Sequence, residues 1–172
     1  RNDVKEEEYL DMIRLKTAVL LGGALKIGAL IAGASENDAD KIYKFGENIG
    51  LAFQLRDDYL DVYGDPEIFG KNIGGDILNN KKTYMLIKAL DRADAKQREE
   101  LNRWLDAETC QPAEKIKAVT ELYNQLDIRS VCENKMRGYY TLAMESLAAV
   151  GVAEERKKEL KNLVKLLMYR EM

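Results

Sequence analysis

The chain has 172 residues, enough for one globular domain with a sizeable core; 46% of them are hydrophobic, 33% are charged, and the formal net charge is −3. This balance excludes general nucleic-acid binding, which needs a clustered basic surface, and intrinsic disorder, which needs low hydrophobicity. The chain has no histidine, so histidine-based catalytic triads and zinc proteases are excluded as well.

Apolar residues recur at helical spacing along almost the whole chain, and no stretch alternates like an exposed strand. We therefore predict an all-α protein, whose first helix covers about residues 4–34 and is broken near Gly22 and Gly23. Residues 15–34 are strongly apolar, but Lys16, Lys26 and several glycines favour a buried, closely packed helix over a membrane span.

Ser35 can cap the next helix, which we expect over residues 36–63. Four glycines and one proline stop any helix in the loop at 64–75. Asp76 is the predicted N-cap of a further helix that carries Lys81, Lys82 and Thr83. Amphipathic, charged helices then follow over residues 94–107, 113–125, 128–150 and 153–170.

The helix before the glycine-rich loop carries an unusual acidic stripe. Gln54, Asp57, Asp58 and Asp61 stand at i, i+3, i+4 and i+7, on one side of a helix that is otherwise mostly apolar. Neighbouring helices must cover the apolar surface, so we expect the stripe to line an internal cavity. Carboxylates that close raise one another's pKa, and bound Mg²⁺, or Mn²⁺ in its place, relieves the repulsion. The alternative is a solvated acidic face.

Three lysines add to this pattern: Lys16 in the apolar first helix, Lys71 in the glycine-rich loop, and Lys81 after it. A lysine in a buried segment needs an anionic partner, and lysine binds phosphate well. Glycine-rich backbone also favours phosphate. Each lysine alone is better interpreted as a surface cation, but the combination of acidic stripe, buried lysine and glycine-rich loop predicts a site for a diphosphate and a metal.

These motifs resemble those of the trans-isoprenyl diphosphate synthases. Residues 53–61 read FQLRDDYLD and resemble the second aspartate-rich motif of that family, FQxxDDxxD. Lys16-Thr17 resembles its Lys-Thr pair. Gly70-Lys71, Asp76 and residues 81–84 resemble the loop and lysine motifs that follow, in the same order and spacing.

The resemblance implies long helices around a central cavity, a homodimer, and head-to-tail condensation of isopentenyl diphosphate with an allylic diphosphate. It implies that Asp57, Asp58 and Asp61 bind Mg²⁺, with Asp57 the strongest candidate. It further implies that three lysines hold diphosphate oxygens and that two polar residues sit beside the allylic cation: Lys16, Lys71 and Lys81, then Thr17 and Gln54. Catalytic roles fall on Asp57, Asp58, Lys16 and Lys71.

The family also has a first aspartate-rich motif, and this chain contains no second cluster of that kind. We therefore expect residues 1–172 to be the C-terminal part of one prenyl-synthase domain and to be inactive alone. Cys110 and Cys132 lack zinc-site spacing, and two isolated thiols suit a protein of the reducing cytoplasm.

Three alternatives stay open. A terpene cyclase or a head-to-head synthase shares the helical fold and the use of Mg²⁺, although the complete DDxxD pattern and the lysines favour chain elongation. A non-catalytic subunit of a heteromeric synthase would show losses among the acidic or lysine positions, and none is lost here. A helical interaction module with a solvated acidic helix would require all four motifs to be coincidental.

Overall fold

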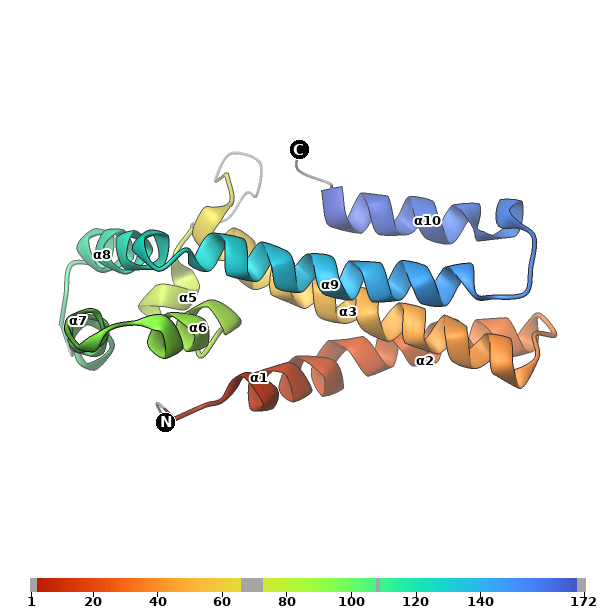
Figure 1. Cartoon of the computed structure of the whole chain (residues 1–172), viewed down its shortest axis with the longest axis horizontal. Coiled ribbons are helices and arrows are strands. Elements are labelled where there is room, and N and C mark those ends of the chain that lie inside the picture. The colour runs from red at the N-terminus through yellow and green to blue at the C-terminus, as the bar shows by residue number, and fades with distance from the viewer. Residues whose placement is uncertain (1–2, 66–72, 108, 170–172) are drawn as a thin grey trace. The chain divides into compact units, whose positions relative to one another are not determined.

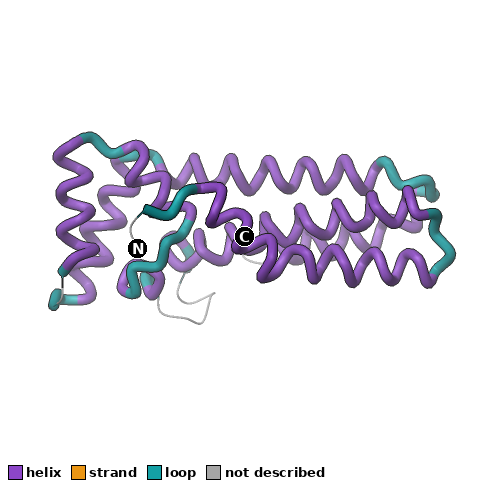
Figure 2. The backbone as a smooth tube through the Cα atoms, turned by 90° about the horizontal axis from the view of Figure 1, so that it is seen from below, coloured by secondary structure: helices purple, strands orange, loops and turns teal. Residues whose placement is uncertain are grey.

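A computed structural model describes residues 3–65, 73–107 and 109–169, and these residues form helices joined by short loops (Figures 1 and 2). No strand occurs in these ranges, and the all-α prediction is confirmed. The elements are α1 (Glu6–Ile13), the π-helical turn η1 (Arg14–Ala18), α2 (Val19–Ile31), α3 (Glu36–Tyr63), α5 (Gly75–Leu78), α6 (Tyr84–Arg92), α7 (Ala95–Asp106), α8 (Pro112–Gln125), α9 (Ile128–Ala148) and α10 (Glu154–Tyr169).

Local capping explains why the longer helices begin where the sequence predicts. Ser35 Oγ accepts a hydrogen bond from the backbone N–H of Asp38 at 3.2 Å, which confirms the predicted cap of α3. Asp94 forms a capping box with Gln97 at the start of α7, and Pro112 occupies the first turn of α8. Both bounds of α3 match the prediction, and α7 to α10 agree within two residues.

Three local predictions are wrong. The first helix does not break near Gly22 and Gly23; its regular α-geometry is interrupted earlier, by η1. Lys81 to Thr83 do not lie on a helix, because α5 ends at Leu78 and Thr83 is the N-cap of α6, accepting from the backbone N–H of Leu86. Asp76 is likewise not a cap. It lies inside α5, and Gly74, at φ +85°, precedes that helix.

The chain divides into two compact units: Arg1–Tyr9 with Asp57–Asn134, and Leu10–Arg56 with Lys135–Met172. In the second unit, α2, α3, α9 and α10 pack around one apolar core. Its buried members come from α3, from α9 and the residues after it, and from α10: Ile42, Phe45, Ile49, Ala143, Leu147, Val150 and Val164. Leu21 and Leu25 of α2 pack against this core.

Small residues let η1 and α2 approach α3 closely. A Cβ added at Gly46 would lie 2.8 Å from Gly22 Cα, and one at Gly50 would lie 2.7 Å from Ala18 Cα. Such distances exclude larger side chains, so the predicted close packing is confirmed. The predicted burial is confirmed for only one side of α2, since Leu20 and Ile31 are 75% and 83% exposed.

In the first unit, α5 and α6 pack with α7 and α8. The contact between α5 and α8 is tight, because a Cβ at Gly74 would lie 2.6 Å from Ile116 Cδ1. The start of α1 is tied to α6, where Lys88 Nζ donates to Glu6 Oε2 at 2.7 Å. No helix within the described ranges is both long enough and apolar enough to cross a membrane.

Candidate active site

Asp58 is the centre of a buried hydrogen-bond network in the first unit. It is only 2% exposed. Its Oδ2 accepts from the Tyr9 hydroxyl at 2.5 Å, and its Oδ1 accepts from Lys81 Nζ at 2.8 Å. Burial raises the pKa of Asp58, while the hydrogen bonds from Lys81 and Tyr9 act in the opposite direction. Both carboxylate oxygens are therefore engaged by partners within the chain.

Lys81 is held between two carboxylates. Its Nζ also donates to Asp76 Oδ2 at 2.8 Å, and its side chain remains 42% exposed. Burial lowers the pKa of Lys81, but the hydrogen bonds to Asp58 and Asp76 outweigh that effect and raise it above its ordinary value. A permanently charged and accessible ammonium is thus fixed beside α3, which is the arrangement a phosphate oxygen needs.

Asp61 organises the turn that carries Asp76. Its Oδ2 accepts from the Asp76 backbone N–H at 2.8 Å, and its backbone carbonyl accepts from the Gly74 N–H at 2.6 Å. Burial is the largest cause of the raised pKa of Asp61, and among nearby charges it is Asp76 that adds to the rise. Asp76 has the same effect on Asp58. Burial and the nearby charge of Asp76 are therefore the main causes that raise the pKa of Asp58 and Asp61.

The predicted stripe does not have one uniform environment. Asp57 is exposed, Asp58 is buried, and Gln54 and Asp61 are half-buried. Across the described ranges, no three Asp, Glu, Cys or His side chains are grouped as a complete metal site. Mg²⁺ often binds one or two carboxylates and completes its shell with water and substrate phosphate. The exposed carboxylate of Asp57, with Asp61 four residues further along α3, fits that requirement.

The second unit brings Thr17 and Gln54 together, as Thr17 Oγ1 lies 3.3 Å from Gln54 Oε1 in a hydrogen bond. Both residues are half-buried, and Thr17 stands on η1. Lys16 is exposed, not buried as predicted; it stands on η1 next to Leu15, which is 57% exposed, so this part of the apolar segment is not covered within the described residues. Single π-turns inside α-helices are frequent at functional sites. Lys71 lies outside the described residues.

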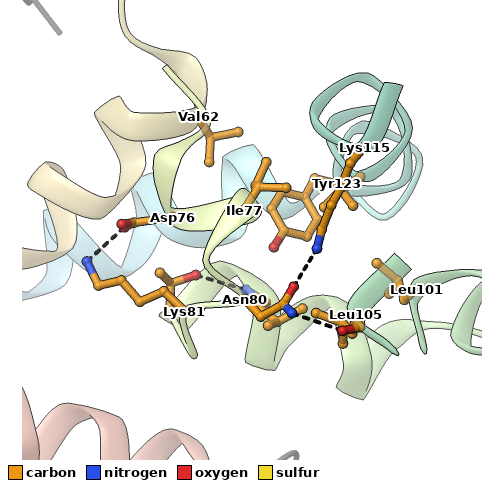
Figure 3. A pocket seen from close by; sticks show the side chains of 12 residues that line it. Val62, Asp76, Ile77, Asn80, Lys81, Leu101, Leu105, Lys115 and Tyr123 are labelled. Carbon is orange, nitrogen blue, oxygen red and sulfur yellow. Dashed lines mark hydrogen bonds and ion pairs between the residues drawn. The ribbon is translucent and has the colours of Figure 1, made fainter. Parts of the chain in front are cut away.

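A pocket in the first unit adjoins Lys81 (Figure 3). Its polar lining includes Asp76, Asn80, Lys81, Lys115 and Tyr123, and its apolar walls come mainly from α6, α7 and α8. Lys115 is buried, and its Nζ donates to Asn80 Oδ1 at 2.7 Å. Neither Asn80 nor Lys115 belongs to a motif recognised in the sequence.

A sequence profile of the polyprenyl synthetases matches residues 1–124. The chain belongs to the polyprenyl synthetase family. A short chain isoprenyl diphosphate synthase from Methanothermobacter thermautotrophicus is 50% identical over 101 residues, which are 59% of this chain and 31% of that protein.

Two solved structures share the fold of this family member. A geranylgeranyl pyrophosphate synthase superposes with a TM-score of 0.90 at 40% identity, over 100% of this chain and 54% of that one. The geranylgeranyl pyrophosphate synthase of Corynebacterium glutamicum, complexed with isoprenyl diphosphate and magnesium, gives a TM-score of 0.84 at 31% identity, over 96% and 47% of the two chains. The chain thus spans about half the length of these structures, and the aligned part is shorter still in the Methanothermobacter protein.

The sequence did not predict the contacts that Tyr9 and Asp76 make in the Lys81 site. Tyr9 is one of nine tyrosines, and only folding places it against Asp58, 49 positions away. Asp76 was expected to cap a helix, yet its side chain holds Lys81. A search for acidic residues four or five positions before a motif lysine would have found Asp76, while no local pattern would have found Tyr9.

Proposed function

We propose that the protein containing these 172 residues is a trans-prenyltransferase that condenses isopentenyl diphosphate head-to-tail with an allylic diphosphate. The observation that carries the proposal is the fixed, accessible ammonium of Lys81, which lies 2.8 Å from both Asp58 and Asp76. Asp58 directly follows Asp57 on α3, and the carboxylate of Asp57 is exposed. One site thus offers a cation for a diphosphate and an exposed oxygen ligand for a divalent metal.

In this proposal, Asp57 and Asp61 hold Mg²⁺, and Lys16, Lys71 and Lys81 contact diphosphate oxygens. Bound Mg²⁺ supplies positive charge that stabilises the departing diphosphate. Asp58 differs from the other acidic residues, since its buried contacts with Tyr9 and Lys81 support a role in orienting Lys81. The magnesium complex of the Corynebacterium relative supports the choice of metal.

The reaction needs no histidine base. The allylic C–O bond breaks, and diphosphate leaves with the electron pair while Lys81 stabilises its charge. The alkene of isopentenyl diphosphate forms the new C–C bond with the allylic cation. The carbocation that results loses a proton, which the released diphosphate accepts. Thr17 and Gln54, hydrogen-bonded to each other, position the allylic group.

The chain supplies the part of the synthase domain with the second aspartate-rich motif. A homodimer and a cytoplasmic location remain predictions from the sequence and its resemblance.

The test incubates the intact protein with Mg²⁺, isopentenyl diphosphate and allylic diphosphates of C5, C10 and C15 length. Diphosphate release and an elongated product are expected. Release from the allylic substrate without isopentenyl diphosphate would instead identify a cyclase or a head-to-head synthase. No turnover with any substrate pair, despite a folded protein, would contradict the proposal and favour a non-catalytic subunit.

Asp57→Asn provides the residue-level test. Removing the charge of a metal-binding carboxylate should reduce kcat/KM by about 100-fold or more, equivalent to at least ~2.7 kcal/mol of transition-state stabilisation. Because Asp57 is exposed, the unfolding midpoint should hardly change. Asp106→Asn is the matched control, since Asp106 is an exposed aspartate on α7 of the same unit. Equal activity of the two variants would remove Asp57 from the proposed metal site.

A further inference from the structure

Lys115 is a buried cation with an uncharged partner. It lies on α8 and is 3% exposed, and its Nζ donates to the Asn80 carbonyl oxygen at 2.7 Å (Figure 3). Within the described residues, no carboxylate lies at ion-pair distance from it. Burying an ammonium without an opposite charge is costly. The apolar pocket walls around it, including Leu101, Leu105 and Val119, would accept a methionine of similar length. Core packing alone therefore does not account for a lysine here.

Asn80 is fixed at both ends of its side-chain amide. Its Oδ1 accepts from Lys115, and its Nδ2 donates to the backbone carbonyl of Leu105 at 2.9 Å. A lysine can only donate and a carbonyl can only accept, so the two ends of the amide cannot be exchanged, and an aspartate could not satisfy both partners. The backbone of Asn80 has φ +51°, a conformation that asparagine tolerates better than most residues.

Asn80, whose side-chain amide is hydrogen-bonded at both ends, directly precedes Lys81. The Lys81 backbone N–H donates to Asp76 O at 3.0 Å, and the chain then enters α6 through the Thr83 cap. The left-handed conformation of Asn80 therefore sets the direction in which the chain leaves α5. That direction brings Lys81 Nζ to within 2.8 Å of both Asp58 and Asp76.

From these contacts we infer that Lys115 and Asn80 are positioning residues that fix Lys81 in the orientation its role in prenyl transfer requires. Lys115 holds the Asn80 amide from α8, Leu105 holds it from the end of α7, and together they lock the turn from which Lys81 projects. The functional half of this inference rests on the proposed prenyl transfer, whereas the placement of Lys81 can be measured without turnover.

The first measurement is the ¹⁵N NMR signal of the Lys81 side-chain ammonium in the intact protein, assigned with Lys81→Met. An ammonium held by two carboxylates gives a protected, resolved signal. Lys115→Met should shift or broaden it, because the Asn80 amide loses its donor. Lys117→Met on the same helix should leave it unchanged, since the Lys117 side chain is 78% exposed. An unchanged Lys81 signal in Lys115→Met would overturn the inference.

Asn80→Gly keeps the test informative if Lys115→Met fails to fold. Glycine adopts positive φ without strain, so the turn can persist while both side-chain hydrogen bonds are lost. The Lys81 signal should again shift or broaden. A normal signal in this variant would show that backbone conformation alone positions Lys81, and the assigned role of the Lys115–Asn80 pair would be wrong.

Measurements of turnover distinguish the positioning of Lys81 by Lys115 and Asn80 from the role of Lys81 in prenyl transfer. Lys115→Met is expected to reduce kcat/KM by about 10- to 100-fold, as losses of supporting residues behind functional groups do. In a Lys81→Met background the same change should cause little additional loss, because its effect passes through Lys81. If Lys115→Met reduced kcat/KM by the same factor in the Lys81→Met background as in wild type, Lys115 would not act through Lys81. A shifted Lys81 signal with unchanged turnover in Lys115→Met would support the positioning of Lys81 by Lys115 and Asn80, and it would refute the role of Lys81 in prenyl transfer.

Discussion

Removing the hydroxyl of Tyr9 tests whether Asp58 depends on its buried partner. Tyr9 is 2% exposed and donates to Asp58 Oδ2 at 2.5 Å. A hydrogen bond to a charged group contributes about 1.5–3 kcal/mol, and Tyr9→Phe leaves one oxygen of a buried carboxylate without its donor. We therefore expect the free energy of unfolding to fall by about 2 kcal/mol. With a urea dependence of ~2 kcal/mol per molar, the midpoint falls by about 1 M.

The matched control is Tyr43→Phe. Tyr43 is a half-buried tyrosine of α3 whose hydroxyl makes no hydrogen bond to any described residue. Loss of the Tyr43 hydroxyl should change the free energy of unfolding by no more than about 0.5 kcal/mol. If urea unfolding followed by circular dichroism shows equal losses for the two variants, the Tyr9–Asp58 hydrogen bond does not stabilise the protein and the reasoning fails.

The stability loss in Tyr9→Phe should also depend on pH, in a direction that the pKa of Asp58 determines. Burial raises the pKa of Asp58, and the Tyr9 hydrogen bond lowers it, so Tyr9→Phe should raise that pKa further. A carboxyl whose pKa is higher in the folded than in the unfolded state destabilises the fold while it is ionised, and this cost disappears as pH falls through the raised pKa. The stability difference between wild type and Tyr9→Phe should therefore shrink on acidification. A difference that grows at low pH would contradict this assignment.

Two further predictions concern the second unit. Gly50→Ala places a Cβ 2.7 Å from Ala18 Cα and should lower the free energy of unfolding in urea by about 1–3 kcal/mol. The control Gly23→Ala on α2 meets nothing within 4 Å and should raise that free energy by about 0.5–1 kcal/mol. Equal effects would mean that η1 and α3 are not in close contact. Hydrogen bonds from Lys161 and Lys157 lower the pKa of Glu154 from 4.5 to about 2, so its stabilising contribution is present above pH 4.5 and is lost as pH falls toward 2. Glu154→Gln should accordingly lose less stability than wild type between pH 4.5 and 2, and parallel acid unfolding curves would refute the depressed pKa.

The sequence by itself determined most of the helices, and it led to the prediction of a metal and diphosphate site at the acidic motif. Helical periodicity and capping are local, so the bounds of α3 and the Ser35 cap could be predicted from adjacent residues. The types and spacing of Asp57, Asp58 and Asp61 indicated a metal and diphosphate site for the same reason. Local rules failed where a packing contact or a turn intervened, as at η1 and in the segment before Thr83.

Only the tertiary structure decided which acidic residues are exposed and which are buried among partners. Asp57 and Asp58 are adjacent in sequence, yet one is exposed, while the other is buried between Tyr9 and Lys81, 49 positions before it and 23 positions after it. The partnership of Lys115 with Asn80 likewise spans 35 positions and depends on how α8 packs beside α5. Such pairings form because separate helices pack together through their apolar faces. The residues around Tyr9, Asn80 and Lys115 show no periodic pattern that would predict which residues the packing brings together.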